Sequence, residues 1–156
     1  MNRKSLAILE YDKIKHKLFQ HATTEMGKRQ VKRLSPSTDL DEIQVKLLQT
    51  KDGADILRLK GGVPIPQLTL ITDHLKRLEI GATLNGKELA EISQVLRSAN
   101  EVHRFFTAPA DEKVELNYLY ELEEQLETLP QLAKRLQVSL EADGYVTDDA
   151  SSLLRS

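Results

Sequence analysis

The longest regular pattern of apolar residues in this chain ends at Phe106. Apolar side chains recur there at steps of three and four residues: Leu89, Ile92, Leu96, Ala99, Val102 and Phe106. This spacing places them along one face of an α-helix. Asn85 is a favourable N-cap, and the Glu88 carboxylate three residues later can reach back to the Asn85 N–H. The pattern predicts a long amphipathic helix that begins with a capping box.

A second long helix is predicted after Asp39, a favourable N-cap with Glu42 at the third helical position. Its apolar stripe follows a seven-residue repeat over nearly three heptads: Leu40, Ile43, Leu47, Thr50, Ala54 and Leu57. We expect this stripe to pack lengthwise against neighbouring helices. Gly53 costs a helix about 1 kcal/mol relative to alanine, which favours a close helix contact or a bend there. Gly61 and Gly62, followed by prolines, end the helix.

Shorter helical patterns fill most of the remaining chain. They cover residues 9–22, 25–34 (capped by Thr23 or Thr24), 70–79, and 116–140 in two pieces, with Pro130 near the start of the second. Leucines mark one face of each piece: Leu119, Leu122, Leu126 and Leu129, then Leu132, Leu136 and Leu140. A last helix, capped by Thr147 or Asp148, is cut off at Ser156, which predicts an artificial boundary there.

These patterns together predict an all-α fold. We expect a multi-helix array of about seven helices without a significant sheet, the last helix being truncated at the C-terminus. At 156 residues the chain is long enough to form one helical module, 1–156. The segment 107–113 contains Pro109 and is the best internal break, so a subdivision into 1–107 and 114–156 is also consistent with the pattern.

Composition limits the classes of protein to which the chain can belong. There is no cysteine, which excludes disulfides and thiolate metal sites and fits a cytoplasmic protein. The first apolar run stops at Glu10, too early for a signal peptide, and no run approaches membrane-spanning length. The net charge of −2 is unevenly distributed: residues 1–34 hold nine Lys/Arg and three Asp/Glu, and residues 111–127 hold one Lys and seven Asp/Glu.

Residues 81–88, GATLNGKE, nearly match the phosphate-binding loop G-x-x-x-x-G-K-[ST]. The last position needs a hydroxyl to bind magnesium, and Glu88 has none. The residues before Gly81 also favour a helix, whereas a phosphate-binding loop follows a strand. A turn between two helices explains the segment better, with Gly81 just past the end of one helix and Asn85 capping the next.

No set of side chains predicts a catalytic centre. The histidines His16, His21, His74 and His103 lack the spacing of a metal site, and a solvated surface position explains them better. The carboxylates Glu121, Glu123, Glu124 and Glu127 are expected to form a solvated helix face, since leucines occupy the opposite side. No nucleophile motif is present. We therefore predict a non-catalytic chain without catalytic, cofactor-binding or metal-binding residues of its own.

One basic segment has a direct rationale for binding. Lys28 and Lys32 are four residues apart, as are Arg29 and Arg33, so the four cations share one helical surface. Such a surface could contact nucleic-acid phosphates without sequence preference. An ordinary solvated face is the alternative, and no aromatic residues for base stacking interleave with the segment.

Several segments resemble the N-terminal region of the Smr-bearing bacterial MutS paralogues. They run through nearly the whole chain in the order expected of that family: 9–14 (LEYDKI), 21–22, 26–28, 34–36, 54–59 (ADILRL), 79–84 (EIGATL), 88–92, 143–151 (DGYVTDDAS) and 154–155. None of the segments is a catalytic motif, so the resemblance lies in their combination.

The resemblance implies the helical core and lever region of a larger cytoplasmic, homodimeric protein. Such proteins carry an ATPase domain that uses ATP and magnesium, a clamp, and an Smr endonuclease domain. They are linked to suppression of homologous recombination through branched DNA and to rescue of collided ribosomes. The nucleotide-binding and nuclease residues of the family lie downstream of Ser156. The implied role is a strut that transmits the state of the ATPase to the clamp, with the downstream domains, DNA or the ribosome as partners and no membrane.

Two other interpretations remain open. The chain could be a stand-alone helical adaptor that binds a protein partner through a leucine face. Alternatively, the basic face of Lys28, Arg29, Lys32 and Arg33 could make it primarily a nucleic-acid-binding module. A downstream ATPase favours the strut, and a natural stop near Ser156 favours the adaptor.

Overall fold

The computed structural model describes residues 7–108 and 114–151, and within these ranges it is all-α, as predicted. The helices are α2 (Tyr11–His21), α3 (Glu25–Arg33), α4 (Leu40–Lys60), α5 (Thr72–Glu79), α6 (Gly86–Phe106), α7 (Leu119–Glu124), α8 (Pro130–Ser139) and the short 3-10 helix η2 (Asp148–Ala150). The only strand-like pairing in this part of the chain is one antiparallel bridge between Leu140 and Val146. Most of the predicted linker, at 109–113, and the predicted last helix beyond 151 lie outside the described residues.

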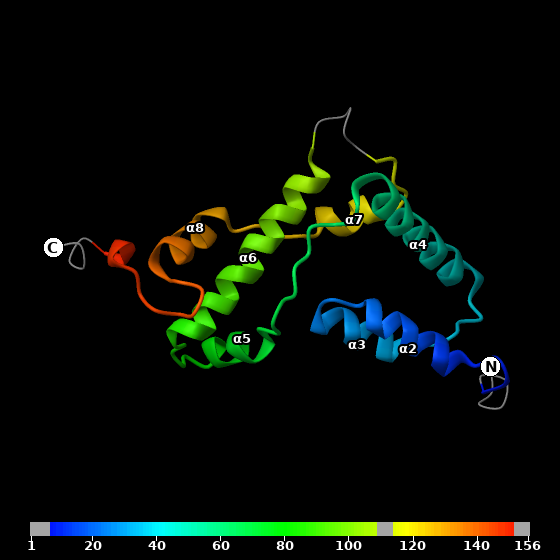
Figure 1. Ribbon diagram of the computed structural model, residues 1–156, viewed down its shortest axis with the longest axis horizontal. Coiled ribbons are helices and arrows are strands. Elements are labelled where there is room, and N and C mark those ends of the chain that lie inside the picture. Colours follow the sequence, from blue (N-terminus) through cyan, green and yellow to red (C-terminus); the bar gives the residue numbers. More distant parts are fainter. Residues whose placement is uncertain (1–6, 109–113, 152–156) are drawn as a thin grey trace.

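The long helix α6 runs through the centre of one half of the molecule, with α8 packed along it and α5 near its N-terminal end (Figure 1). The helix α7 lies between α6 and α4 and contacts both. The helices α2 and α3 form an antiparallel pair below α4 in this view. No helix in residues 7–108 and 114–151 combines the length and the apolar content that crossing a lipid bilayer requires.

Local capping decides where α3, α4 and α6 begin, as the sequence predicted. The Asn85 side chain accepts a hydrogen bond from the Glu88 N–H at 3.0 Å, and Glu88 accepts one from the Asn85 N–H at 2.9 Å, which completes the capping box of α6. Asp39 accepts from the Glu42 N–H in the same way at α4, and Thr24 accepts from the Gly27 N–H at α3. Gly61 ends α4 with a φ of 79°, a conformation that favours glycine.

The buried apolar core is small and is spread over α4, α6, α8 and the segment before α7. Its buried members are Ile56, Ile92, Phe106, Val114 and Ala133. The ring of Phe106 meets the ring of Tyr120 edge to face, with 5.6 Å between centroids. The Tyr120 hydroxyl donates to the Val114 carbonyl at 3.0 Å, which fixes the segment before α7 over the end of α6.

Three sequence expectations about packing are wrong. The heptad stripe of α4 is not its buried face: Leu40, Leu47 and Leu57 are exposed, and the buried residues of the helix are Asp52 and Ile56. The first predicted helical piece after residue 116 is only the six residues of α7, so its leucines do not form one continuous face. Of the two expectations for Gly53, the close helix contact is wrong among the described residues, because a Cβ there would meet nothing within 4 Å, and the bend stays a prediction.

Candidate interaction surfaces

The near match to a phosphate-binding loop is a packing feature. Gly86 is the first residue of α6, and a Cβ added to it would lie 2.0 Å from the Gly144 carbonyl oxygen. Gly144 has a φ of +91°, and a Cβ added to it would lie 2.3 Å from the backbone nitrogen of Lys87. The two backbones therefore touch, so the turn around Gly144 covers the start of α6.

The segment between Gly81 and Asn85 is the turn between two helices that the sequence predicted. The helix α5 precedes it, and Gly81, with a φ of 77°, donates its N–H to the Leu78 carbonyl at 2.9 Å. The carboxylate of Glu88 accepts from the Asn85 N–H and from Arg77. The Asn85 hydrogen bond and the Arg77 charge lower the pKa of Glu88. An anionic carboxylate beside a covered helix start does not fit the phosphates of a nucleotide.

Asp52 joins α4 to the start of α7. Its carboxylate is fully buried and accepts hydrogen bonds from the backbone N–H groups of Asn117, Tyr118 and Leu119, at 2.7 to 3.1 Å. The Asn117 side-chain amide donates to it as well, at 2.8 Å. The first residues of α7 have no cap of their own, so Asp52 caps this helix from a position 65 residues earlier in the chain.

The hydrogen bonds keep this buried carboxylate charged. Burial alone would raise the pKa of Asp52, but the donors from Tyr118, Asn117 and Leu119 outweigh it and lower the pKa to about 2. Sequence reasoning missed this residue. The available signal was an aspartate within a second α4 stripe of Val45, Leu48 and Ile56, where an apolar side chain would be expected.

Two histidine–glutamate pairs join further helices. His74 Nε2 lies 2.8 Å from Glu91 Oε2, which links α5 to α6. His103 Nδ1 bonds to Glu123, which links α6 to α7. The His74 side chain is 17% exposed and the Glu123 side chain is 8% exposed, so the expectation of a solvated position is wrong for these two residues. The His103 side chain is 45% exposed, in agreement with its predicted surface position. In the described part of the chain, no three His, Asp or Glu side chains converge as a metal site.

The structure divides the predicted basic surface of α3 into two halves. Lys28 pairs with Glu25 at 2.8 Å, and the ammonium groups of Lys28 and Lys32 lie 6.0 Å and 5.3 Å from the centroid of the Phe19 ring on α2. Arg29 and Arg33 are exposed, and no carboxylate pairs with either among the described residues. Arg29 and Arg33 are thus the exposed cations of this surface that contact neither a carboxylate nor the Phe19 ring among the described residues.

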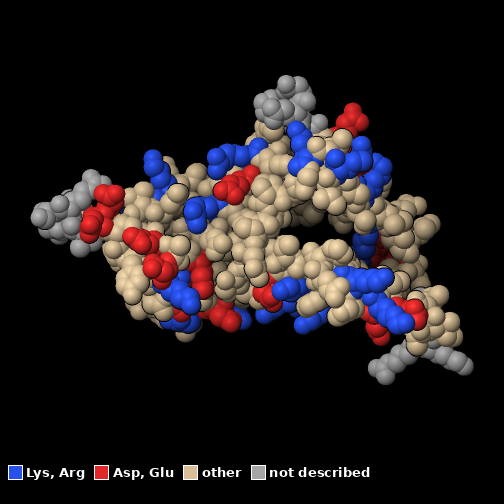
Figure 2. All heavy atoms as spheres, viewed as in Figure 1, with Lys and Arg blue, Asp and Glu red and all other residues tan. Residues whose placement is uncertain are grey.

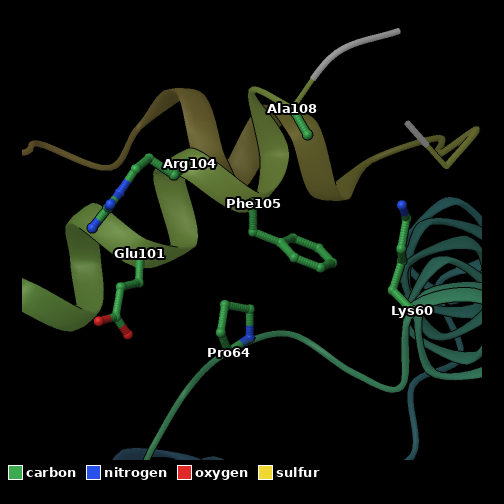
Figure 3. A pocket seen from close by; sticks show the side chains of 6 residues that line it. All are labelled: Lys60, Pro64, Glu101, Arg104, Phe105 and Ala108. Atoms are coloured by element: carbon green, nitrogen blue, oxygen red, sulfur yellow. The ribbon is translucent and has the colours of Figure 1, made fainter. Parts of the chain in front are cut away.

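A cleft of about 550 Å³ lies between the end of α4, the segment after it and the end of α6 (Figure 3). The ring of Phe105 points towards Pro64 and Lys60, whereas Arg104 and Glu101 lie along the other flank of α6 (Figure 3). The described lining residues hold no nucleophile and no pair of carboxylates. The cleft therefore offers no recognisable catalytic set.

The exposed heptad stripe of α4 is a further candidate surface. Leu40, Leu47 and Leu57 are 66%, 63% and 64% exposed, and they lie on the side of α4 opposite the stripe that includes Asp52 and Ile56. Helix α4 thus has one face fixed to α7 and one apolar face that the described residues leave uncovered. Figure 2 shows a hollow between the α4 half of the molecule and the α2–α3 pair.

Comparison with known proteins gives a consistent result. No family model matches the chain. Curated relatives named endonuclease MutS2 match it along its length: 58% identity over 156 residues in Ligilactobacillus salivarius, 52% over 155 in Latilactobacillus sakei and 44% over 156 in Enterococcus faecalis. These matches cover 99 to 100% of this chain but only 20% of each relative's length. The chain is therefore similar along its whole length to the N-terminal region of proteins named endonuclease MutS2, as the sequence resemblance predicted, and it spans about a fifth of their length.

Proposed function

We propose that the chain is a non-catalytic helical core and lever segment of a MutS-like ATPase that clamps nucleic acid. The observation that carries the proposal is the Asp52 anchor between α4 and α7. Together with the bond of Glu123 to His103, it joins α4, α7 and α6 into one braced unit. A braced set of helices can move as a rigid body, which is how a strut would pass a conformational change from one domain to another.

The remaining parts of this function come from the family resemblance. The rest of the parent protein would bind ATP and magnesium, form a homodimer in the cytoplasm, and carry the nuclease. Branched DNA, in suppression of homologous recombination, and collided ribosomes are its proposed targets. Arg29 and Arg33, with Lys28 and Lys32, would add contacts to the phosphate backbone.

The test uses the protein that carries this chain at its natural length. We expect Asp52→Asn to leave ATP hydrolysis intact but to reduce the effect of ATP on the dissociation rate of bound branched DNA. Asp41→Asn is the matched control, because Asp41 is an exposed aspartate in the first turn of the same helix. Hydrogen exchange at α7 would show that the anchor has loosened. The proposal would be contradicted if hydrogen exchange at α7 becomes faster while ATP still changes the dissociation rate of branched DNA as it does in the native protein.

A stand-alone adaptor is the second candidate, and the exposed leucines of α4 favour it. The size of the native polypeptide separates the two functions. An antibody raised against this chain should detect a protein several times longer if the chain is a strut. A protein of the length of this chain would support the adaptor.

A further inference from the structure

The uncovered face of α4 has the register of a coiled-coil seam. Positions a and d of three successive heptads are Leu40, Ile43, Leu47, Thr50, Ala54 and Leu57. The stripe runs along nearly all of α4. Its opposite face is held by α7 through Asp52, so the direction in which the seam points is fixed by the fold.

Within α4 the charged residues beside the seam are all Lys or Arg, although the N-cap Asp39 shares an edge with Lys46, and Lys46 pairs with Glu42. One edge holds Gln44, Lys51 and Arg58, and the other holds Lys46, Gly53 and Lys60. The acidic residues of α4 lie away from both edges: Asp41, Glu42, Asp52 and Asp55. Asp55 pairs with both Lys51 and Arg58, at 2.9 Å and 3.1 Å, so this edge keeps a net positive charge.

This charge pattern disfavours two partners that the chain itself could supply. In a pair of α4 helices, cations would face cations in either orientation. The α2–α3 pair is also basic, with seven Lys/Arg and three Asp/Glu in residues 10–33. A partner that matches the seam instead needs an apolar stripe flanked by Asp and Glu.

We propose that the α4 seam docks an amphipathic helix with acidic flanks that belongs to the same polypeptide, in the part that this chain does not span. The relatives provide the length for such a helix, since this chain covers only 20% of each. The inference rests on the proposed function only in taking the chain as a segment of a longer protein. The stripe that is exposed among the described residues would then be buried by a helix outside them.

Site-specific photo-crosslinking in the natural-length protein tests the proposal. A benzophenone amino acid replaces Leu47 or Leu57 on the seam, and Leu59 serves as control because it is 53% exposed and lies off the seam. We expect the two seam positions to crosslink, within one polypeptide, to a peptide with Asp or Glu beside its apolar stripe. Crosslinks between two copies, crosslinks to α2–α3, equal labelling from Leu59, or no crosslink at all would overturn the proposal.

Charge reversal tests the acidic flanks separately. Lys51→Glu with Arg58→Glu should lower the crosslink yield from Leu47 about tenfold, and reversing the acids on the captured helix to Lys should restore it. Lys134→Glu with Arg135→Glu on α8 is the control and should leave the yield unchanged. An unaltered yield in the α4 variant would overturn the proposed charge complementarity. Neither arm requires ATP or nucleic acid, so a failure here is distinct from a failure of the Asp52 test.

Discussion

Asp52 shows how one buried side chain can decide the position of a helix. Helix α7 has six residues, no side-chain cap of its own, and no cation in its last turn to offset the helix dipole. Its first N–H groups point at the Asp52 carboxylate, which supplies both the missing acceptors and a negative charge at the helix start. A residue of α4 therefore caps the start of α7.

This anchor predicts a specific dependence of stability on pH. The pKa of Asp52 is lowered from 3.8 to about 2 in the folded protein, so its contribution is fully present above pH 4 and is lost as the pH falls towards 2. The shift corresponds to about 2 kcal/mol. Because the folded-state pKa is about 2, only about half of this contribution is lost at pH 3, so urea unfolding at pH 6 and pH 3 should show a loss of about 1 kcal/mol in the native chain and a smaller loss in Asp52→Asn. If the two proteins lose equal stability, and Asp41→Asn behaves like both, the anchor is not the cause.

The contact between Gly86 and Gly144 predicts a second effect of a single residue. Gly86→Ala would place a methyl group 2.0 Å from the Gly144 carbonyl oxygen, so one of the two backbones must move. We expect a loss of about 1–3 kcal/mol in the free energy of unfolding, the usual cost of overpacking. Thermal unfolding measures it. A stability equal to that of the native chain would mean that the turn around Gly144 does not press on α6.

At the scale of the element, α4 shows which features of the fold could be predicted from the sequence. Its ends were predictable because Asp39 and Gly61 act on the backbone next to them. Its buried face was not, because the helix carries two apolar stripes and the sequence alone does not say which one α7 covers. The regular heptad stripe was the natural choice, yet the buried stripe is the one that contains Asp52.

The sequence also could not show which side chains of other helices contact the predicted basic residues of α3. The basic cations of α3 were found from their spacing, but the Phe19 ring that engages Lys28 and Lys32 lies on another helix. The leucines after residue 116 predicted a long helix, whereas α7 ends at Glu124, before Leu126 and Leu129 of the predicted stripe. Pro130 then starts α8, as predicted.

Gly53 gives a test at the level of the α4 helix. It lies inside α4, and a Cβ there would meet no atom within 4 Å. Gly53→Ala should therefore raise the free energy of unfolding by about 0.5–1 kcal/mol, because alanine loses less backbone entropy in a helix. Urea unfolding of this chain is the measurement. A destabilised variant would show that another segment packs closely at Gly53.

At the scale of the whole molecule, positive charge is concentrated on several separate surfaces. Figure 2 shows Lys and Arg clusters on the α4 side and on the α2–α3 pair, whereas basic and acidic side chains are mixed over the α5–α8 half. On α4 the cations flank an apolar seam, which suits a protein partner. On α3 the two exposed arginines have no apolar stripe between them, which suits a phosphate backbone.

This difference predicts which cations contribute to nucleic-acid affinity. In the natural-length protein, Arg29→Glu with Arg33→Glu should weaken binding to branched DNA and reduce the slope of log K against log salt by about 2, since each lost phosphate contact removes about 0.9. Lys28→Glu with Lys32→Glu should have a smaller effect, because both ammonium groups lie over Phe19 and Lys28 is paired with Glu25. Lys134→Glu with Arg135→Glu controls for the change in net charge. Fluorescence anisotropy across a salt series measures all three, and an affinity that stays the same after all four α3 cations are reversed would rule out the α3 surface as a nucleic-acid contact.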